Sequence, residues 1–563
     1  MNKVELHYKK EKEVAYCMKS FKNLILLAAL VLVLAACNFG GDSGGEGEAD
    51  SSGGEGEAEK SINLSITSDP PSFHPALATD TTSGAIMASV FEGLTRLDPE
   101  GNPEPAMAEN IEVSEDELTY TYTLRDAEWS NGDPVTAQDF EYAWKWALNP
   151  ENASDYAYQL YYIEGAEAYN TGEGSADDVA VTAVDDKTLE VTLNNPTPFF
   201  DELTAFYTYY PVNSKMAEEN PDWHTDPNGE NYIGNGPFVL DSFASSDAIV
   251  LKKNDSYWDA ENVALDTVNI DMVESEATAL KMYQSGDLDY LGSPFNTIDL
   301  NALNQFKEDG TLNIRDQAGT YMYVFNVQDE IMQNKNIREA LTIAIDREGL
   351  IENVTKGEQK PGTGLVPLTM EGFEEPTEYF QSNDLEAAKE ALDKGLEELG
   401  LSDPSELKIA LSYNTSEAHA QIAQFIQQGW KKDLGIDVSL NNSEWQVYLE
   451  ELDAGNHQVG RYGWLGDFND PINFLEIYKN EGGNNNTGWT NEEYTQLLND
   501  AAKETDPETR TQMMKDAEEI FMNDFPIAPI YFYTNLSVHD EKVKNMKSDP
   551  LGNVQLKYVD IEE

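Results

Sequence analysis

Residues 460–467 combine two opposite charges with three glycines in one short segment, Gly460-Arg461-Tyr462-Gly463-Trp464-Leu465-Gly466-Asp467. In an extended strand Arg461 and Asp467 lie roughly 20 Å apart, so they cannot pair with each other and can instead bind the two ends of one ligand. Glycine lets a second backbone approach closely, and an unpaired strand edge offers main-chain donors and acceptors to any extended peptide. The segment therefore predicts a site that binds an extended peptide; a surface turn with solvated charges is the alternative.

The rest of the sequence lacks the motifs of the common catalytic and metal sites. The six histidines form no H-x-x-x-H or H-E-x-x-H pair, so no zinc site is predicted. No G-x-x-x-x-G-K-S/T loop is present, and the serine-elbow match at 41–45 has no strand or helix pattern around it. We therefore expect no enzyme activity, no metal and no cofactor. So acidic a sequence allows a carboxylate pair for glycoside hydrolysis, but it does not indicate which two residues would form the pair.

The composition indicates a large and strongly acidic globular protein. A chain of 563 residues is too long for one core, so two or three lobes are expected. The 104 acidic and 36 basic residues give a formal charge of −68, which argues against nucleic acid or an anionic membrane surface as a partner held by charge. A solvated surface is the usual reason for such a surplus, and a high-salt habitat is a further hypothesis because salt screens the self-repulsion.

The N-terminal part is predicted to be a signal peptide followed by a disordered tether. Two lysines precede the apolar run 24–35, which is too short to span a bilayer comfortably and fits the core of a signal peptide. The run ends in Leu34-Ala35-Ala36-Cys37, which resembles the lipobox of bacterial lipoproteins. Residues 1–36 are thus predicted to be a signal peptide, with Met18 a better start than Met1, and Cys37 to be lipidated. Residues 37–60 are rich in Gly, Ser, Glu and Asp, and we expect a disordered acidic tether.

The remaining sequence changes from a β-rich pattern to alternating helices and strands. A strand is predicted at 62–66, and the region from about 96 to 209 is largely β, with alternating apolar residues at 118–124 and 189–193 and one helix N-capped by Thr136. The later part favours helices beginning near 337 and 422, with the second ending at 435, helices at 385–399, 492–502 and 508–522, and strands at 436–440 and 527–533. Such alternation implies an α/β lobe with a buried mixed sheet.

Several landmarks in a fixed order give the sequence, from about residue 62 to its end, a family resemblance. They are the lipobox, AEWSNG at 127–132, NPTP at 195–198, GNGP at 234–237, and IREAL at 337–341 followed by Asp346-Arg347. With these landmarks the chain resembles the extracellular solute-binding proteins of family 5. The resemblance is greatest to the oligopeptide-binding lipoproteins of ABC importers.

The resemblance implies an α/β fold of the periplasmic-binding-protein-like type II class (cluster C). Two lobes would close over the ligand, and an extra β-rich lobe would pack outside them. Lobe I would comprise 60–95, 210–318 and 534–563, lobe II would comprise 96–209, and lobe III would comprise 319–533.

The resemblance also implies a function: capture of extracellular oligopeptides and their delivery to the permease subunits of an ABC transporter. The protein would be a monomer outside the cytoplasm, held at the outer face of the cell membrane by lipid on Cys37 alone. Alternatives within this fold are binding of dipeptides, a nickel chelate or an oligosaccharide, or reception of a peptide pheromone. A secreted hydrolase is disfavoured because no nucleophile with a base is evident.

The resemblance assigns roles to the residues of the glycine-rich segment. Asp467 would bind the α-ammonium group of the peptide, and Arg461 the carboxylate of short peptides. Gly463 and Leu465 would pair with the peptide backbone, and Trp464 between them belongs to the same binding segment.

Two further site residues and two departures follow from the same resemblance. His419 would meet the carboxylate of longer peptides, and Trp445 would line a side-chain pocket. Leu452 replaces a second carboxylate-binding arginine of the family, and Ser83 replaces an acid on the first lobe. The preferred peptide length therefore stays open.

Overall fold

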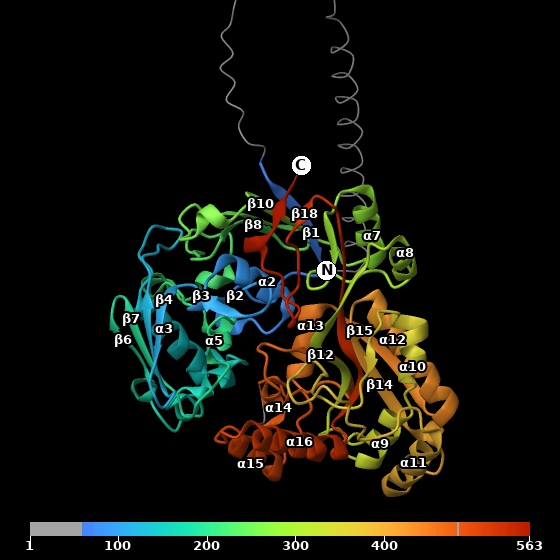
Figure 1. Cartoon of the computed structure of the whole chain (residues 1–563). Helices are drawn as coiled ribbons and strands as arrows, with labels where there is room; N and C mark the ends of the chain where they lie inside the picture. Colours follow the sequence, from blue (N-terminus) through green and yellow to red (C-terminus); the bar gives the residue numbers. More distant parts are fainter. Residues whose placement is uncertain (1–58, 481–482, 563) are drawn as a thin grey trace, which may run out of the picture. The chain divides into compact units, whose positions relative to one another are not determined.

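Three large sheets organise the part of the chain that the computed structural model describes, residues 59–480 and 483–562 (Figure 1). Residues 1–58 lie outside the described part of the chain. They include the predicted signal peptide, Cys37 and all but the last two residues of the predicted tether. The predicted combination of a β-rich part with a mixed α/β part is confirmed. No helix in the described residues is long and apolar enough to cross a membrane.

The first sheet joins strands that are far apart in the sequence. Its order is β1 (Ser61–Ile66), β10 (Thr267–Met272), β9 (Ala248–Lys253) and β8 (Phe238–Ala244). β1 pairs in parallel with β10, with Ile62 opposite Val268 and Leu64 opposite Ile270; all four side chains are buried. The predicted strand at 62–66 is confirmed, and this part also contains the helices α2 (Thr81–Val90), α6 (Ser214–Glu219), α7 (Glu276–Ser285) and α8 (Leu303–Asp309).

The second sheet is antiparallel, and a single long helix packs against it. Its order is β4 (Ala108–Val113), β5 (Thr119–Leu124), β7 (Thr188–Thr192) and β6 (Val181–Asp185). Every second side chain of β5 is buried, as its alternating sequence predicts. The helix α3 (Ala137–Leu148) packs on β6 and β7 and buries Phe140, Trp144 and Ala147. The other elements of this part are β2 (Thr95–Leu97), β3 (Pro103–Pro105), α4 (Ala166–Asn170) and α5 (Phe200–Leu203).

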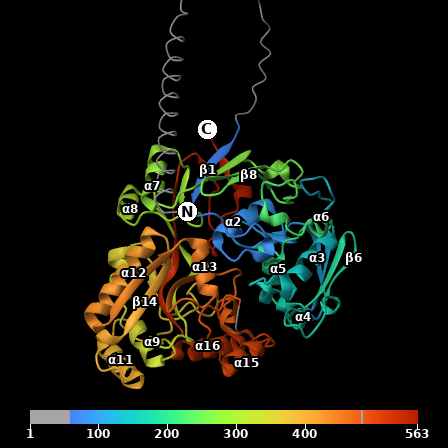
Figure 2. The same ribbon diagram turned by 180° about the vertical axis from the view of Figure 1, so that it is seen from behind.

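The third sheet has seven strands and is mixed, as predicted for the second half. Its order is β11 (Tyr290–Gly292), β17 (Ile527–His539), β12 (Asn313–Phe325), β16 (Val459–Leu465), β14 (Lys408–Asn414) and β15 (Asp437–Ser443), with β13 (Lys360–Pro361) also paired to β17. Both views place α9 and α11 on the side away from the second sheet (Figures 1 and 2). The helices of this part are α9 (Lys335–Ile343), α10 (Arg347–Leu350), α11 (Leu385–Leu399), α12 (Glu417–Gly429), α13 (Trp445–Asp453), α14 (Ile472–Leu475), α15 (Glu492–Ala501) and α16 (Pro507–Asp524).

Two long strands cross the expected boundary between lobes I and III. β12 and β17 are antiparallel neighbours of 13 residues each, and their register shifts between Asp316 and Thr320. The strand predicted at 527–533 was too short, because β17 continues to His539 and there pairs with β11. The boundaries expected at 318/319 and 533/534 thus fall inside continuous strands.

One buried carboxylate connects the start of α3 to two other segments. Asp139 is 4% exposed. It accepts from the Thr136 backbone N–H at 2.9 Å and from the Trp129 indole N–H at 3.1 Å, and its second oxygen accepts from the Ser214 N–H and hydroxyl at 2.9 and 2.8 Å. The residue that caps this helix thus also connects the β-rich part to the start of α6 in the first-sheet part.

The substitution Asp139→Ala should destabilise the protein markedly. It removes the capping box of α3 and leaves buried donors without partners, which costs about 2–4 kcal/mol. Asp178→Ala is the matched control, because Asp178 closes an equivalent capping box with Ser175 that is exposed. Thermal unfolding should show a large decrease of Tm for the first variant and a small one for the second; equal decreases would contradict the account.

Candidate ligand-binding site

β16, which carries the glycine-rich segment, is paired on both sides only at its beginning. β12 pairs with it along its whole length, but β14 pairs with it only at Val459 and Gly460. β16 therefore lies inside the sheet and is not one of its outer strands. The side of β16 that faces β14 nevertheless has no strand partner beyond Gly460.

The backbone groups of Gly463 and Leu465 point toward this open side. The Gly466 N–H donates to the Ala318 carbonyl at 2.8 Å, and antiparallel pairing alternates inward and outward groups. The N–H and C=O groups of Trp464 therefore face β12, whereas those of Gly463 and Leu465 face away from it. An extended ligand placed here can pair with a strand edge that β12 already holds in position.

A tyrosine keeps the two strands apart. Tyr448 of α13 donates its hydroxyl to the Arg461 carbonyl at 2.8 Å, and the same oxygen lies 3.2 Å from the Ser412 carbonyl of β14. Tyr448 is 1% exposed, so it is fixed by its surroundings. Its hydroxyl takes the place of the next hydrogen bond between β14 and β16. The remainder of β16 then has no strand partner on the β14 side.

A cavity of about 720 Å³ borders the open side of β16. Arg461, Leu465, His419 and Trp445 line it, together with residues of the expected lobe I such as Thr81. Its walls thus come from the two parts that β12 and β17 connect. The other lining residues lie mainly in segments 67–69, 293–300, 414–422, 444–446 and 531–536.

One end of the open strand carries a fixed positive charge among tyrosines. Arg461 donates to the Tyr533 hydroxyl at 2.9 Å, and its guanidinium lies 4.8 Å from the centre of the Tyr321 ring. The Tyr321 hydroxyl is 3.2 Å from Nδ1 of His419. Burial, and then the charge of Arg461, hold the pKa of His419 well below its ordinary value. His419 is therefore neutral near pH 7, and Arg461 supplies the charge that can attract a carboxylate.

The other end carries a carboxylate whose three donors are all neutral. Asp467 accepts from Gln159 at 2.7 Å and from Tyr156 and Asn473 at 3.3 Å each. Burial raises the pKa of Asp467 to about 7, and these three hydrogen bonds lower it in part. The ionised carboxylate thus pays a desolvation cost that a cationic ligand group would offset.

Two expectations for the segment need correction. Trp464 is on the face of β16 opposite to Arg461; it is 4% exposed and donates its indole N–H to Asn473 at 2.9 Å. It therefore supports the Asp467 loop and does not line the cavity. Gly463 was expected to leave room for the backbone of a ligand. The room that its missing side chain leaves is instead filled by the Tyr533 hydroxyl, which a methyl group at this position would overlap.

Trp445 lines the cavity, whereas the two positions that depart from the family pattern do not. The Trp445 indole N–H lies 3.5 Å from Asp80 at the start of α2, so this side chain reaches across to the expected lobe I. Leu452 and Ser83 are 1% and 0% exposed, and neither lines the cavity.

Sequence reasoning missed the residues that hold the two charges. Asn473 accepts from the Asp467 backbone N–H at 3.0 Å as well as from Trp464, and donates to the Asp467 carboxylate. Its position six residues after Asp467 was a usable signal. Gln159 and Tyr156 come from the β-rich part, more than 300 residues earlier, and no local pattern marks them.

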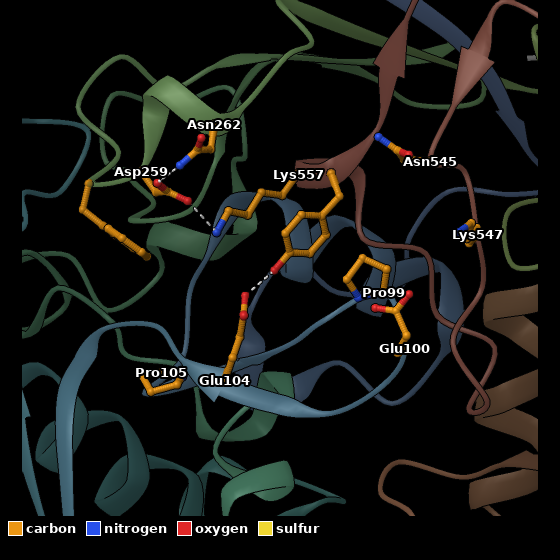
Figure 3. Close-up of a pocket in the computed structure, with 11 residues that line it drawn as sticks. Pro99, Glu100, Glu104, Pro105, Asp259, Asn262, Asn545, Lys547 and Lys557 are labelled. Carbon is orange, nitrogen blue, oxygen red and sulfur yellow. Dashed lines mark hydrogen bonds and ion pairs between the residues drawn. The ribbon is translucent and has the colours of Figure 1, made fainter.

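A second cavity, of about 730 Å³, lies beside the β2–β3 hairpin and the C-terminal segment (Figure 3). Two of its charged groups are paired with each other, and a third accepts from a tyrosine. Lys557 forms an ion pair with Asp259 at 2.9 Å, and the Tyr558 hydroxyl donates to Glu104 at 2.6 Å. These bonds connect distant segments of the chain.

A cavity between two parts joined by continuous strands defines a binding protein that closes around its ligand. Residues 102–486 match the family described as bacterial extracellular solute-binding proteins, family 5 Middle. The chain belongs to this family.

Similar proteins include peptide-binding members of that family. The chain is 52% identical over 541 residues to the oligopeptide-binding protein OppA of Bacillus subtilis, which covers 95% of this chain and 98% of OppA. The structure of Haemophilus influenzae OppA in complex with the peptide RPPGFSPFR has a TM-score of 0.85 at 29% identity, covering 90% of this chain and all of that one. The periplasmic-binding-protein-like fold with two closing lobes and an extra lobe is thereby confirmed.

Two structures of one relative indicate which arrangement the lobes adopt. A structure of the Escherichia coli murein tripeptide-binding protein MppA has a TM-score of 0.83 at 32% identity, covering 90% of this chain and 99% of that one. The form of MppA described as unliganded and open has a TM-score of only 0.59 at similar coverage. The described residues thus have an arrangement unlike the open form.

The substitution Gln159→Leu should raise the pKa of Asp467 above its value of about 7, because it removes the shortest hydrogen bond to the carboxylate. Carbon-detected NMR titration of aspartate-labelled protein measures this pKa directly. Gln138→Leu is the control, since the amide of Gln138 donates to Asp186 in an exposed hydrogen bond and does not contact Asp467. An unchanged Asp467 pKa in Gln159→Leu would contradict the geometry.

Proposed function

We propose that this protein is the substrate-binding component of an ABC transporter and captures extracellular oligopeptides for a membrane permease. One observation carries the proposal: the backbone groups of Gly463 and Leu465 form an open strand edge between the charges of Arg461 and Asp467. Main-chain pairing gives affinity for an extended peptide without reading its side chains. The 52% identity to an oligopeptide-binding protein supports the same function.

In the proposed complex Asp467 binds the α-ammonium group of the peptide. The carboxylate is already desolvated and hydrogen-bonded in the free protein, so the pair forms with little reorganisation. Gly463 and Leu465 then continue the ladder along the peptide backbone. Arg461 binds the carboxylate of short peptides, and neutral His419 donates to that of longer ones. Trp445 lines a side-chain pocket, where water adapts to different guests.

We infer that lobes I and III close around the peptide, with the lobes divided as proposed from the sequence. Lobe I (60–95, 210–318 and 534–563) and lobe III (319–533) share the cavity, while lobe II (96–209) contributes Gln159 and Tyr156 behind Asp467. β12 and β17 connect lobes I and III as continuous strands, which suits a hinge that bends without unfolding. A peptide contacting both lobes favours the closed state.

The proposal includes the setting in which the protein works. It is a monomer outside the cytoplasm, held on the outer face of the cell membrane by lipid on Cys37, and it has no enzyme activity. The family and the relatives support transport, since their names describe solute- and peptide-binding proteins.

Native mass spectrometry of residues 38–563, purified without added ligand, tests the function. We expect a ladder of bound masses that fit peptides of mixed sequence, because backbone pairing tolerates any side chain. A single sharp adduct would instead support a dedicated ligand such as a dipeptide, a nickel chelate or an oligosaccharide. Deleting the cognate permease would separate nutrient uptake from pheromone reception.

Affinity for a peptide with a free amino terminus should depend on pH through Asp467. The free-protein pKa is about 7, and binding a cation favours the ionised carboxylate, so binding releases a proton at lower pH. Affinity for RPPGFSPFR should therefore rise from about pH 5 to about pH 7.5, and fall above about pH 8 as the α-amino group loses its proton. Isothermal titration calorimetry in several buffers measures both the affinity and the proton release.

Two controls separate Asp467 from other titrating groups. Asp467→Asn should lose about 2–5 kcal/mol of binding free energy at pH 7.5 and abolish the rise below pH 7. N-acetylated RPPGFSPFR should bind weakly and without that rise. An acetylated peptide that binds as well as the free one would show that Asp467 does not hold the amino terminus.

A further inference from the structure

The starts of two helices, one from each closing lobe, are joined by reciprocal hydrogen bonds. Glu276, the first residue of α7 in proposed lobe I, accepts from the Ser416 hydroxyl at 2.6 Å and the Ala418 N–H at 3.1 Å. In return Glu417, the first residue of α12 in proposed lobe III, accepts from the Ser275 hydroxyl at 3.1 Å and the Ala277 N–H at 3.2 Å. Each glutamate thus caps the helix of the other lobe. We name this four-bond contact the reciprocal cap.

The two halves of the reciprocal cap differ in burial. Glu276 is 1% exposed, whereas Glu417 is exposed. Beside Glu276, Ala418 of α12 packs in a buried apolar cluster with Ala279 of α7 and Val538 of β17. A carboxylate in such surroundings depends on its donors and on the positive end of the α12 dipole, because water does not reach it.

The reciprocal cap is connected to the ligand cavity through α12. Ala418, His419 and Ile422 of this helix line the cavity, whereas Glu276 does not. Ser416, which donates to Glu276, also accepts from the His419 N–H at 3.2 Å. The bond to Glu276 therefore holds the turn of α12 that presents His419, without touching the ligand.

We propose that Glu276 is an affinity-determining positioning residue: by capping α12 from lobe I it holds the lobes closed around a peptide that it never contacts. The inference rests on the proposed peptide-binding function. When the lobes separate, the Glu276 carboxylate, the Ser416 hydroxyl and the Ala418 N–H all return to water. The bonds therefore exist only in the closed state, and they oppose the opening that must precede release.

This predicts an effect on dissociation and not on association. A contact that forms after the peptide has entered leaves the association rate constant unchanged and lowers the dissociation rate constant. In Glu276→Ala the dissociation rate constant for RPPGFSPFR should increase about ten- to hundred-fold, the range for losing two hydrogen bonds of ordinary strength. Glu276→Gln keeps an acceptor and should lie between this variant and the wild type. Glu417→Ala should have a smaller effect, because its bonds are in solvent.

Stopped-flow fluorescence with RPPGFSPFR measures both rate constants, and thermal unfolding without peptide measures the ligand-free protein. Glu390→Ala is the control, since Glu390 is exposed on α11; it should behave as wild type. The Tm of ligand-free Glu276→Ala should also stay unchanged, because the open protein hydrates this carboxylate. A double-mutant cycle with Ser416→Ala should be non-additive in the dissociation rate.

Two results would overturn the inference and leave the function intact. One is wild-type binding with an unchanged dissociation rate in Glu276→Ala. The other is a lower ligand-free Tm together with slower association, which would make the reciprocal cap a rigid junction that persists when the lobes open. If instead the wild type binds neither RPPGFSPFR nor any co-purified peptide, the proposed function itself fails, and the inference with it.

Discussion

The binding edge depends on the separation of β14 and β16 by the hydroxyl of Tyr448. Two neighbouring strands of a buried sheet normally continue their ladder, since unpaired backbone groups away from water are costly. Here one phenol satisfies the Arg461 carbonyl where the ladder stops, and the strands separate beyond it. The unpaired groups of Gly463 and Leu465 then border a cavity, where water or a ligand can satisfy them. The site is thus a local interruption of an otherwise ordinary mixed sheet.

The two charges of the candidate site lie in different surroundings. In an acidic protein, Asp467 accepts from neutral donors alone; burial raises its pKa to about 7, and these hydrogen bonds lower it only in part. At the other end Arg461 is kept charged among tyrosine hydroxyls while His419 is kept neutral. A molecule with a cation and an anion at opposite ends of an extended chain fits both conditions at once.

The parts of the structure that local patterns encode could be predicted from the sequence. The alternation in β5, the Thr136 cap of α3 and the limits of α11 all depend on residues within one or two turns. The end of β17 was missed, because the pairing of residues 537–539 with β11 is set by a strand about 250 residues earlier. Residue types were enough to predict a site between Arg461 and Asp467, but they did not show which strands pair with β16. They also could not show that Trp464 turns inward or that Gln159 supports Asp467, since both follow from tertiary packing.

The parallel pairing of β1 with β10 has a mechanical consequence. β1 begins at Ser61, and its six residues are in register with β10 along their whole length. Any tension transmitted along the chain from residues before Ser61 enters the first sheet as shear, which loads all the ladder bonds together. With the lipid anchor proposed at Cys37, proposed lobe I would be the part that carries the load of the anchor, and lobe III the part that moves when the ligand enters or leaves.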